Sequence, residues 1–287
     1  MSIGDTERAT QDRVVSFFKD RDILDYEYVG NLKDAANKNI REDRLRAYLR
    51  LSGYSQKLID GAVSELVKAA DDMTHGLYDA NHKVYSLLKY GAKVKETADG
   101  APKTVYFMDV ETPTNNDFAI AEEVTVVGRQ EKRPDLVIYV NGIAMAVIEL
   151  KKSSVSVSNG IRQNLTNQKD GFIAPFFTTM QFCMAGNETE GLRYGTILTG
   201  EKYYIRWNIT MGLYWIRPYS FINLDSRNRW FIANAQNMPG EFVVAAEKKL
   251  KKVPYAADYL EIKDLCKKVL DAGQYDYKSF PDLSYTA

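Results

Sequence analysis

Three ionisable side chains stand at the ends of two apolar segments, where their types and spacing would support chemistry. Residues 133–152 read RPDLVIYVNGIAMAVIELKK, in which Asp135 opens the first apolar run and Glu149 and Lys151 close the second. Glu149 and Lys151 are two residues apart, so on a strand their side chains point to the same face. Burying a carboxylate and an ammonium group costs several kcal/mol per ion unless each group has a partner.

A hard divalent cation is one natural partner for these carboxylates. Mg²⁺ takes oxygen ligands and needs few carboxylates, because it keeps several of its waters. A lysine beside such an ion can hold or deprotonate an attacking water and can stabilise negative charge on a phosphate. Together these groups would make a site for phosphodiester hydrolysis. The pattern is short, and the alternative that the charges form a solvated rim at a strand end stays open at this point.

The turn between the two apolar runs decides whether these groups can meet. With a two-residue loop at Asn141 and Gly142, Asp135 and Glu149 would point to opposite faces of the sheet. With a three-residue loop, or an equivalent one-residue bulge between turn and site, Asp135 would pair with Val147 and share a face with Glu149. The chemistry therefore predicts the odd-length loop or the bulge, against the usual reading of an Asn-Gly turn.

Hydrophobic periodicity predicts the elements that hold this site. A first helix is expected over 6–19, with Glu7 and Gln11 extending its apolar face. Further helices are predicted over 41–51, 55–70, 78–90, 159–169 and, in two parts, 241–270. Strands are predicted over 26–29, 93–95, 104–109, 118–127, 135–140, 143–151, 178–185, 194–199 and 202–208. This order predicts an α/β protein with a mixed sheet and helices on its faces.

The composition excludes a globally basic nucleic-acid binder, because 38 basic residues balance 38 acidic ones. A local basic cleft is still compatible with that balance. Cys183 and Cys266 are far apart and match no CxxC pattern, which favours reduced thiols in a cytosolic protein. There is neither an apolar signal core nor a run of membrane-spanning length. We therefore expect a cytoplasmic protein with no membrane partner.

Other chemistries find little support. His75 and His82 lie in a helical region without Cys or carboxylate at zinc spacing, so they are expected to be surface or packing residues. The motifs GxSxG, HExxH, GxxxxGK[ST] and GxGxxG do not occur. Aromatic residues near the end of the predicted sheet fit either base stacking or sheet packing; they are Tyr203, Tyr204, Trp207, Tyr214, Trp215 and Tyr219.

Longer stretches resemble a known family. KRPDLVIYVNGIAMAVIELKKSSVSVSNGIRQN and FFTTMQFCMAGNETEGLRYGTI carry the likeness, with YDANHKVYSLLKYGAKV and NDFAIAEEVTV, over roughly residues 6–208. The chain resembles the N-terminal endonuclease region of the R subunit of type I restriction enzymes, within the PD-(D/E)xK nuclease superfamily. The resemblance implies a mixed β-sheet flanked by helices, a helical insertion after the first helix, and Mg²⁺-dependent cleavage of double-stranded DNA.

The resemblance also implies roles for individual residues. Asp135, Glu149 and Lys151 match the catalytic trio, and the metal would lie between Asp135, Glu149 and the carbonyl oxygen of Leu150. Glu7 matches the acidic residue that many members place on the first helix, as a further metal ligand.

A second family motif is matched in part. Gln163 matches the glutamine of a Gln-x-x-x-Tyr motif on the helix after the site, whereas Asn167 stands at the tyrosine position. An ordinary solvent-facing role for Gln163 also stays open. Residues proposed as phosphate contacts are Lys152, Arg162 and Lys169.

The predicted organisation is an endonuclease domain over 1–240 and a helical segment or linker toward a motor region over 241–287. R subunits of the family continue into a motor with a P-loop, so ATP is implied for the parent enzyme and not for this chain. The implied partners are double-stranded DNA and the modification and specificity subunits of a type I restriction complex. The alternative is a non-cleaving DNA- or subunit-docking module that keeps the nuclease fold.

Overall fold

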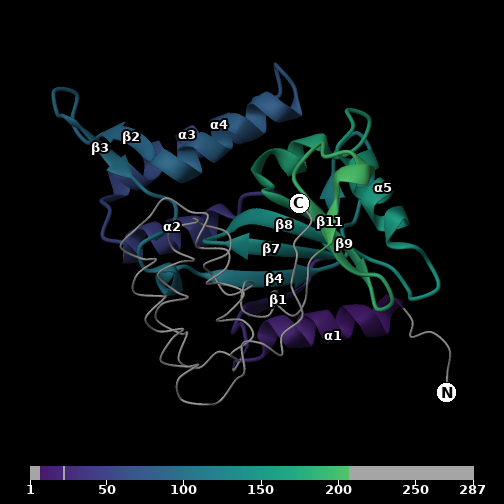
Figure 1. Ribbon diagram of the computed structural model, residues 1–287. Helices are drawn as coiled ribbons and strands as arrows, with labels where there is room; N and C mark the ends of the chain where they lie inside the picture. The colour runs from purple at the N-terminus through teal and green to yellow at the C-terminus, as the bar shows by residue number, and fades with distance from the viewer. Residues whose placement is uncertain (1–6, 22, 207–287) are drawn as a thin grey trace, which may run out of the picture. The chain divides into compact units, whose positions relative to one another are not determined.

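A seven-stranded mixed sheet forms the centre of the domain in the computed structural model, which describes residues 7–21 and 23–206 (Figure 1). The strand order is β1-β4-β7-β8-β9-β10-β11; β1/β4 and β8/β9 are parallel, and the other neighbours are antiparallel. The predicted α/β class is therefore confirmed. The strands are β1 (Glu27–Asn31), β4 (Phe118–Glu122), β7 (Leu136–Val140), β8 (Ile143–Leu150), β9 (Phe182–Asn187), β10 (Gly191–Gly195) and β11 (Ile205–Arg206).

Helices form where the periodicity placed them, with ends that differ by one or two residues. In Figure 1, α3 and α4 lie side by side, and α1 runs beneath β1. They are α1 (Glu7–Lys19), α2 (Glu42–Leu51), α3 (Gln56–Asp71), α4 (Leu77–Tyr90) and α5 (Val157–Asn167), with 3₁₀ turns η1 (Pro113–Asn115), η2 (Ala174–Thr179) and η3 (Glu201–Tyr203). Two small hairpins complete the described part: β2 (Ala92–Lys95) with β3 (Pro102–Val105), and β5 (Val126–Val127) with β6 (Glu131–Lys132).

The helices α1 and α5 cover opposite faces of the sheet. Along β4, Ala119 and Ala121 join the buried cluster that includes Ile161 of α5. The alternate residue Phe118 faces the other way and stacks on Tyr26, against which Phe18 of α1 packs. Because neighbouring side chains on a strand alternate, every functional residue on these strands can be assigned to the α1 face or the α5 face.

Several predicted strands are shorter than expected. The predicted strand over 118–127 is two strands, because Glu123 has a φ of 51° and breaks the extended run. Residues 178–179 belong to η2 and not to a strand, residues 106–109 lie beyond the end of β3, and residues 196–199 turn away after β10. The predicted helices over 241–270, the domain boundary at 240, Cys266, Trp207, Tyr214, Trp215 and Tyr219 lie outside the described residues.

The hairpin between β7 and β8 has a two-residue turn, which corrects the prediction of a three-residue loop. Val140 pairs with Ile143, and Asn141 and Gly142 have φ values of 51° and 80°. Positive φ at both positions is what a type I′ turn requires. The buried side chain of Asn141 donates to the carbonyl oxygen of Phe107 at 2.8 Å, so tertiary contacts also fix this turn.

A one-residue bulge on β8 compensates for the even-length turn. Consecutive residues of β7 pair with Ala144 and Ala146, which leaves Met145 as the extra residue. The carbonyl oxygen of Met145 accepts a hydrogen bond from the main-chain nitrogen of Gln181 at 2.8 Å. That of Ala144 accepts one from Oγ1 of Thr179 at 2.7 Å. The last residue of η2 and the segment that follows it therefore hold the bulge in place.

Because of the bulge, Asp135 and Glu149 share a face. Val137 pairs with Val147 beyond the bulge, and the same register brings Asp135 opposite Glu149. The predicted partner of Asp135, Val147, is therefore wrong by two residues. The prediction of a bulge between turn and site is confirmed, and with it the shared face, because a two-residue shift preserves the face of a strand.

Candidate active site

The carboxylates of Asp135 and Glu149 meet at the end of β7 and β8 that lies away from the turn. Glu149 is 0% exposed, and its Oε2 accepts a hydrogen bond from Nε2 of Gln163 at 2.7 Å. Its Oε1 is buried and has no hydrogen-bond partner among the described residues. Oδ2 of Asp135 accepts from the main-chain nitrogen of Leu150 at 2.7 Å. A buried oxygen without a donor is costly, and a bound cation would remove that cost.

Both carboxyl groups resist ionisation in the absence of a cation. Burial raises the pKa of Asp135 to about 6, although the Leu150 N–H and the Lys151 charge act in the opposite direction. Burial, and then the charge of Asp135, raise the pKa of Glu149 well above its usual value. Perturbed pairs of this kind are concentrated at functional sites.

Lys151 lies between the carboxylates and the first helix. Its Nζ is 2.7 Å from the carbonyl oxygen of Leu150, 3.3 Å from Oε1 of Glu7 and 3.9 Å from Oδ2 of Asp135. The prediction that Glu7 comes near Asp135 is thus confirmed, with Lys151 between them. Direct ligation of a metal by Glu7 stays a prediction.

The oxygen donors at this site fit Mg²⁺. In residues 7–21 and 23–206 no group of three or more His, Cys, Asp or Glu side chains is arranged to hold a metal ion, but Mg²⁺ does not need three such side chains. Asp135, Glu149 and the Leu150 carbonyl would supply three oxygens, and Mg²⁺ is commonly bound through one or two carboxylates with waters in the remaining positions. The unpartnered Oε1 of Glu149 is the feature that such an ion would satisfy.

The helix α5 reaches the site because of a glycine. A Cβ atom at Gly160 would lie 2.9 Å from Cβ of Ala185 and 3.4 Å from Cβ of Glu149. Only glycine therefore allows α5 to pack this closely, and Gln163 on that helix reaches Glu149. The solvent-facing interpretation of Gln163 is wrong. Asn167, one turn further along, is buried.

The residues proposed as phosphate contacts have different surroundings. Lys152 and Lys169 are exposed. Arg162 is bound to Oε1 of Glu201 at 3.3 Å, so it is already paired with an acid.

A second buried carboxylate lies on the opposite face and was missed by the sequence reasoning. Glu122, the last residue of β4, accepts hydrogen bonds from the Tyr28 hydroxyl at 2.7 Å, Gln11 Nε2 at 3.2 Å and Arg8 Nη2 at 3.2 Å. Gln11 also contacts the carbonyl oxygen of Asp135 at 3.4 Å. The available signal was the run FAIAE, an apolar strand that ends in a carboxylate as β8 does.

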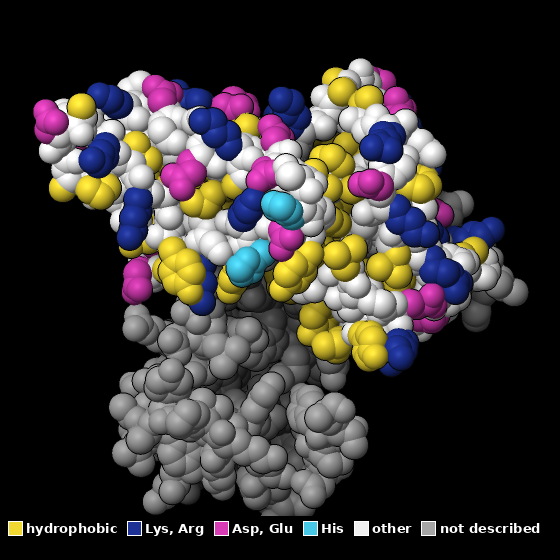
Figure 2. All heavy atoms as spheres, turned by 90° about the horizontal axis from the view of Figure 1, so that it is seen from above, with side chains coloured by type: hydrophobic (Ala, Val, Ile, Leu, Met, Phe, Trp, Pro, Cys, Tyr) yellow, Lys and Arg dark blue, Asp and Glu magenta, His cyan; other side chains and the backbone are white. Residues whose placement is uncertain are grey.

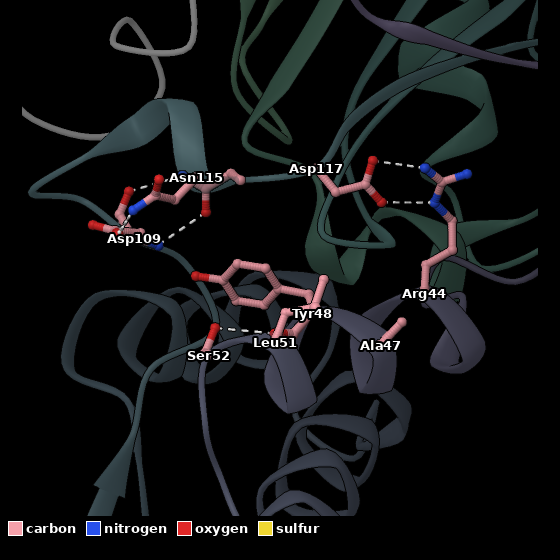
Figure 3. A pocket seen from close by; sticks show the side chains of 9 residues that line it. Arg44, Ala47, Tyr48, Leu51, Ser52, Asp109, Asn115 and Asp117 are labelled. Atoms are coloured by element: carbon pink, nitrogen blue, oxygen red, sulfur yellow. Dashed lines mark hydrogen bonds and ion pairs between the residues drawn. The ribbon is translucent and has the colours of Figure 1, made fainter.

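An open hollow of about 700 Å³ lies at the other end of the sheet (Figure 3). The main-chain nitrogen of Asp117 donates to Oδ1 of the turn residue Asn141 at 2.7 Å, which places the hollow at the turn. Arg44 donates twice to Asp117, so its charge is satisfied. The hollow is therefore separate from the Asp135–Glu149 end of β7 and β8. The lining residues are Arg44, Ala47, Tyr48, Leu51, Ser52, Asp109, Asn115, Asn116 and Asp117.

Surface features agree with the balanced composition. Figure 2 shows basic, acidic and hydrophobic side chains interspersed on one face, with both histidines (cyan) among them. His75 and His82 are exposed, as predicted. Cys183 is a free buried thiol, and Tyr204 is buried while Tyr203 is exposed. Among the helices of the described ranges, none is both long and apolar enough to cross a membrane.

Comparison with known proteins assigns the family. The family described as type I restriction enzyme R protein N terminus (HSDR_N) matches residues 6–202, and a domain of unknown function (DUF8425) matches residues 177–287.

Two relatives carry names from the same class. The type I restriction enzyme HindI endonuclease subunit of Haemophilus influenzae is 33% identical over 100 residues, which are 33% of this chain and 10% of the relative. The type I restriction enzyme EcoprrI endonuclease subunit of Escherichia coli is 25% identical over 192 residues, 62% of this chain and 55% of the relative. The chain thus spans about half of the latter and a tenth of the former. Since one family matches more than half of its length, the chain belongs to the family of type I restriction enzyme R protein N termini.

Proposed function

We propose that this chain is an endonuclease domain that hydrolyses phosphodiester bonds of double-stranded DNA with Mg²⁺, within a type I restriction-modification system. The observation that carries the proposal is the pair of the partly buried Asp135 and the fully buried Glu149, which has one unpartnered carboxylate oxygen and a lysine beside it. The names of the relatives support the restriction context. The modification and specificity subunits of such a system are the proposed partners, and the cytoplasm is the proposed location.

Asp135, Glu149 and the carbonyl oxygen of Leu150 would hold the ion. When bound, Mg²⁺ supplies positive charge that polarises a phosphoryl oxygen and promotes ionisation of water. Gln163 donates to Oε2 of Glu149 and so fixes the orientation of that carboxylate. The chain's own residues thereby place two carboxyl groups side by side at one end of β7 and β8, where a bound cation would favour their charged forms.

Lys151 orients the attacking water and balances negative charge on the phosphate. Its ammonium group has three donors, of which one reaches the Leu150 carbonyl and another Glu7. The side chain is 13% exposed, so the third donor can point toward an incoming group. Glu7 restrains the ammonium from the α1 side.

A calorimetric titration with Mg²⁺ tests the site, with Asp135→Asn as the variant and Asp117→Asn, at the far end of the sheet, as the matched control. The wild-type chain and the control are expected to bind the ion, and Asp135→Asn to bind it more weakly. Cleavage of a plasmid by the purified chain with Mg²⁺ tests the reaction. Equal Mg²⁺ affinity in Asp135→Asn and wild type would exclude the metal site and favour a docking module that keeps the nuclease fold.

A further inference from the structure

A short exposed hairpin leads directly into Asp135. The strands β5 and β6 pair through Val126 with Lys132 and Val127 with Glu131, and the turn between them closes with a hydrogen bond from Gly128 to Gln130. All residues from 127 to 131 are exposed, and Val127 is 60% exposed. The hairpin ends three residues before the candidate metal ligand.

Contacts with Phe172 hold this hairpin against the segment that follows α5. The main-chain nitrogen of Arg129 donates to the Phe172 carbonyl oxygen at 3.2 Å. Nζ of Lys132 lies 4.9 Å from the centroid of the Phe172 ring. A Cβ atom at Gly128 would overlap the Phe172 carbonyl oxygen, so this close approach requires glycine. An exposed hairpin that is held by two contacts with Phe172 is suited to contact another molecule rather than to fill the core.

The charge of the hairpin favours an anionic partner. Residues 128–133 (GRQEKR) carry three cations and one anion. Arg133 is paired with Glu123 at 2.8 Å, and Lys132 lies over Phe172. Within residues 7–21 and 23–206, the guanidinium of Arg129 makes no ion pair or hydrogen bond. The tip therefore presents an exposed cation without a described partner.

The hairpin is close enough to the site to contact the same nucleic acid. Asp135 is six positions after Arg129 in the chain, so their Cα atoms are at most about 22 Å apart. Phosphates on one strand of a duplex recur about every 3.4 Å along the helix axis. A duplex held at the carboxylates would therefore place several phosphates within this span.

We propose that the β5–β6 hairpin is a DNA-backbone contact, in which Arg129 binds a phosphate of the duplex near the bond that is cleaved. The inference rests on the proposed nuclease function, because that function places the duplex at Asp135. Arginine contacts to phosphates fix position without reading sequence. The hairpin would thus hold DNA of any sequence against the site.

The test measures duplex affinity of the full chain at several salt concentrations, with Lys151→Ala in every sample to prevent cleavage and Mg²⁺ present. A fluorescein-labelled duplex of arbitrary sequence is the probe. Log affinity falls linearly as log salt rises, and Arg129→Ala is expected to make this negative slope shallower by about 0.9, the value for one phosphate contact on duplex DNA. Arg50→Ala, an exposed arginine on α2, is the matched control and is expected to leave the slope unchanged.

A second variant tests whether the position of the hairpin matters as well as its charge. Gly128→Ala keeps every charge but displaces the hairpin from Phe172. It is therefore expected to make the negative slope of log affinity against log salt shallower, as Arg129→Ala does. Thermal melting is expected to show an intact fold. An unchanged slope in Arg129→Ala, or no duplex binding by the parental chain, would overturn the inference. Mg²⁺ titration and DNA cleavage by the wild type decide the nuclease proposal separately. If the wild type binds Mg²⁺ and cuts DNA, but Arg129→Ala leaves the salt dependence of duplex affinity unchanged, only the proposed hairpin contact is overturned.

Discussion

Glu122 and Glu149 are buried carboxylates at the same end of one sheet, yet their surroundings are opposite. Glu122 faces α1 and accepts hydrogen bonds from three side chains. Glu149 faces α5, accepts one from Gln163, and keeps one buried oxygen without a partner among the described residues. Burial of a carboxylate is therefore shared by both residues, whereas the unsatisfied oxygen beside a second carboxylate distinguishes Glu149, and the proposed metal site rests on it.

The pKa shifts express the same difference. Burial is the largest influence on the pKa of Glu122 and would raise it, but hydrogen bonds from Tyr28 and Arg8 outweigh burial and lower it. Burial and Asp135 both raise the pKa of Glu149. The protein's own donors thus stabilise the charge of Glu122 on the α1 face, whereas the surroundings of Glu149 on the α5 face disfavour its charge.

The largest expected effect is on the rate of DNA cleavage, in variants of the site around Glu149. Lys151→Ala is expected to slow DNA cleavage by about 10²–10⁴-fold, the usual contribution of a group that handles protons. Glu149→Gln is expected to abolish cleavage and to weaken Mg²⁺ binding more than Lys151→Ala does, since only the former removes a ligand oxygen. Plasmid cleavage by the assembled enzyme and Mg²⁺ calorimetry measure the two effects. Near wild-type cleavage by either variant would show that the assignment is wrong.

A smaller effect is expected from the residue that orients Glu149. Gln163→Ala is expected to lower Mg²⁺ affinity by about 10–100-fold, as loss of an outer hydrogen-bond partner typically does. Arg162→Ala, the neighbouring residue on α5, is the control and is expected to retain wild-type affinity. Calorimetric titration measures both. Equal affinities in the two variants would remove Gln163 from the site.

For the free energy of unfolding, the larger loss is expected at Glu122 and not at Glu149. In EDTA, Glu122→Gln is expected to destabilise the fold by about 1–3 kcal/mol, because an amide cannot satisfy all three donors. Glu149→Gln is expected to cost less or to stabilise, because it removes a buried carboxyl group whose Oε1 lacks a hydrogen-bond partner. Urea denaturation followed by circular dichroism measures both. A larger loss for Glu149→Gln would reverse the comparison.

The smallest effect is in the pH dependence of stability. The lowered pKa of Glu122 gives stability that is present above the unfolded pKa of about 4.3 and is lost as pH falls through the folded value. The raised pKa values of Asp135 and Glu149 act oppositely, so stability falls as pH rises from about 4 through the Asp135 value of about 6.

The two variants should therefore show opposite trends in EDTA. The advantage of Glu149→Gln over wild type is expected to grow between about pH 4 and pH 7, where the unfolded carboxyl groups ionise. The deficit of Glu122→Gln is expected to shrink as the pH falls below about 4. Denaturant midpoints across this range measure both, and parallel pH profiles for the two variants would contradict the opposed shifts.

The comparison of Glu122 with Glu149 also shows which parts of the structure could be predicted from the sequence. Glu149 and Lys151 could be singled out because spacing of two on an apolar strand is a local signal. The bulge could be inferred only because the chemistry needed it: IAMAVI contains no glycine or other local mark, and the contact that holds Met145 comes from Gln181, far along the chain. The roles of Arg8 and Tyr28 were not predictable, since they lie 114 and 94 residues from Glu122.

The bulge at Met145 makes the site depend on a count of residues as well as on their identity. Replacing Met145 by another side chain leaves the number of residues between turn and site unchanged. Deleting one residue from this part of β8 would produce a regular hairpin, in which Glu149 turns to the α1 face, away from Gln163. This buried stretch should therefore tolerate apolar substitutions of similar volume better than single-residue insertions or deletions.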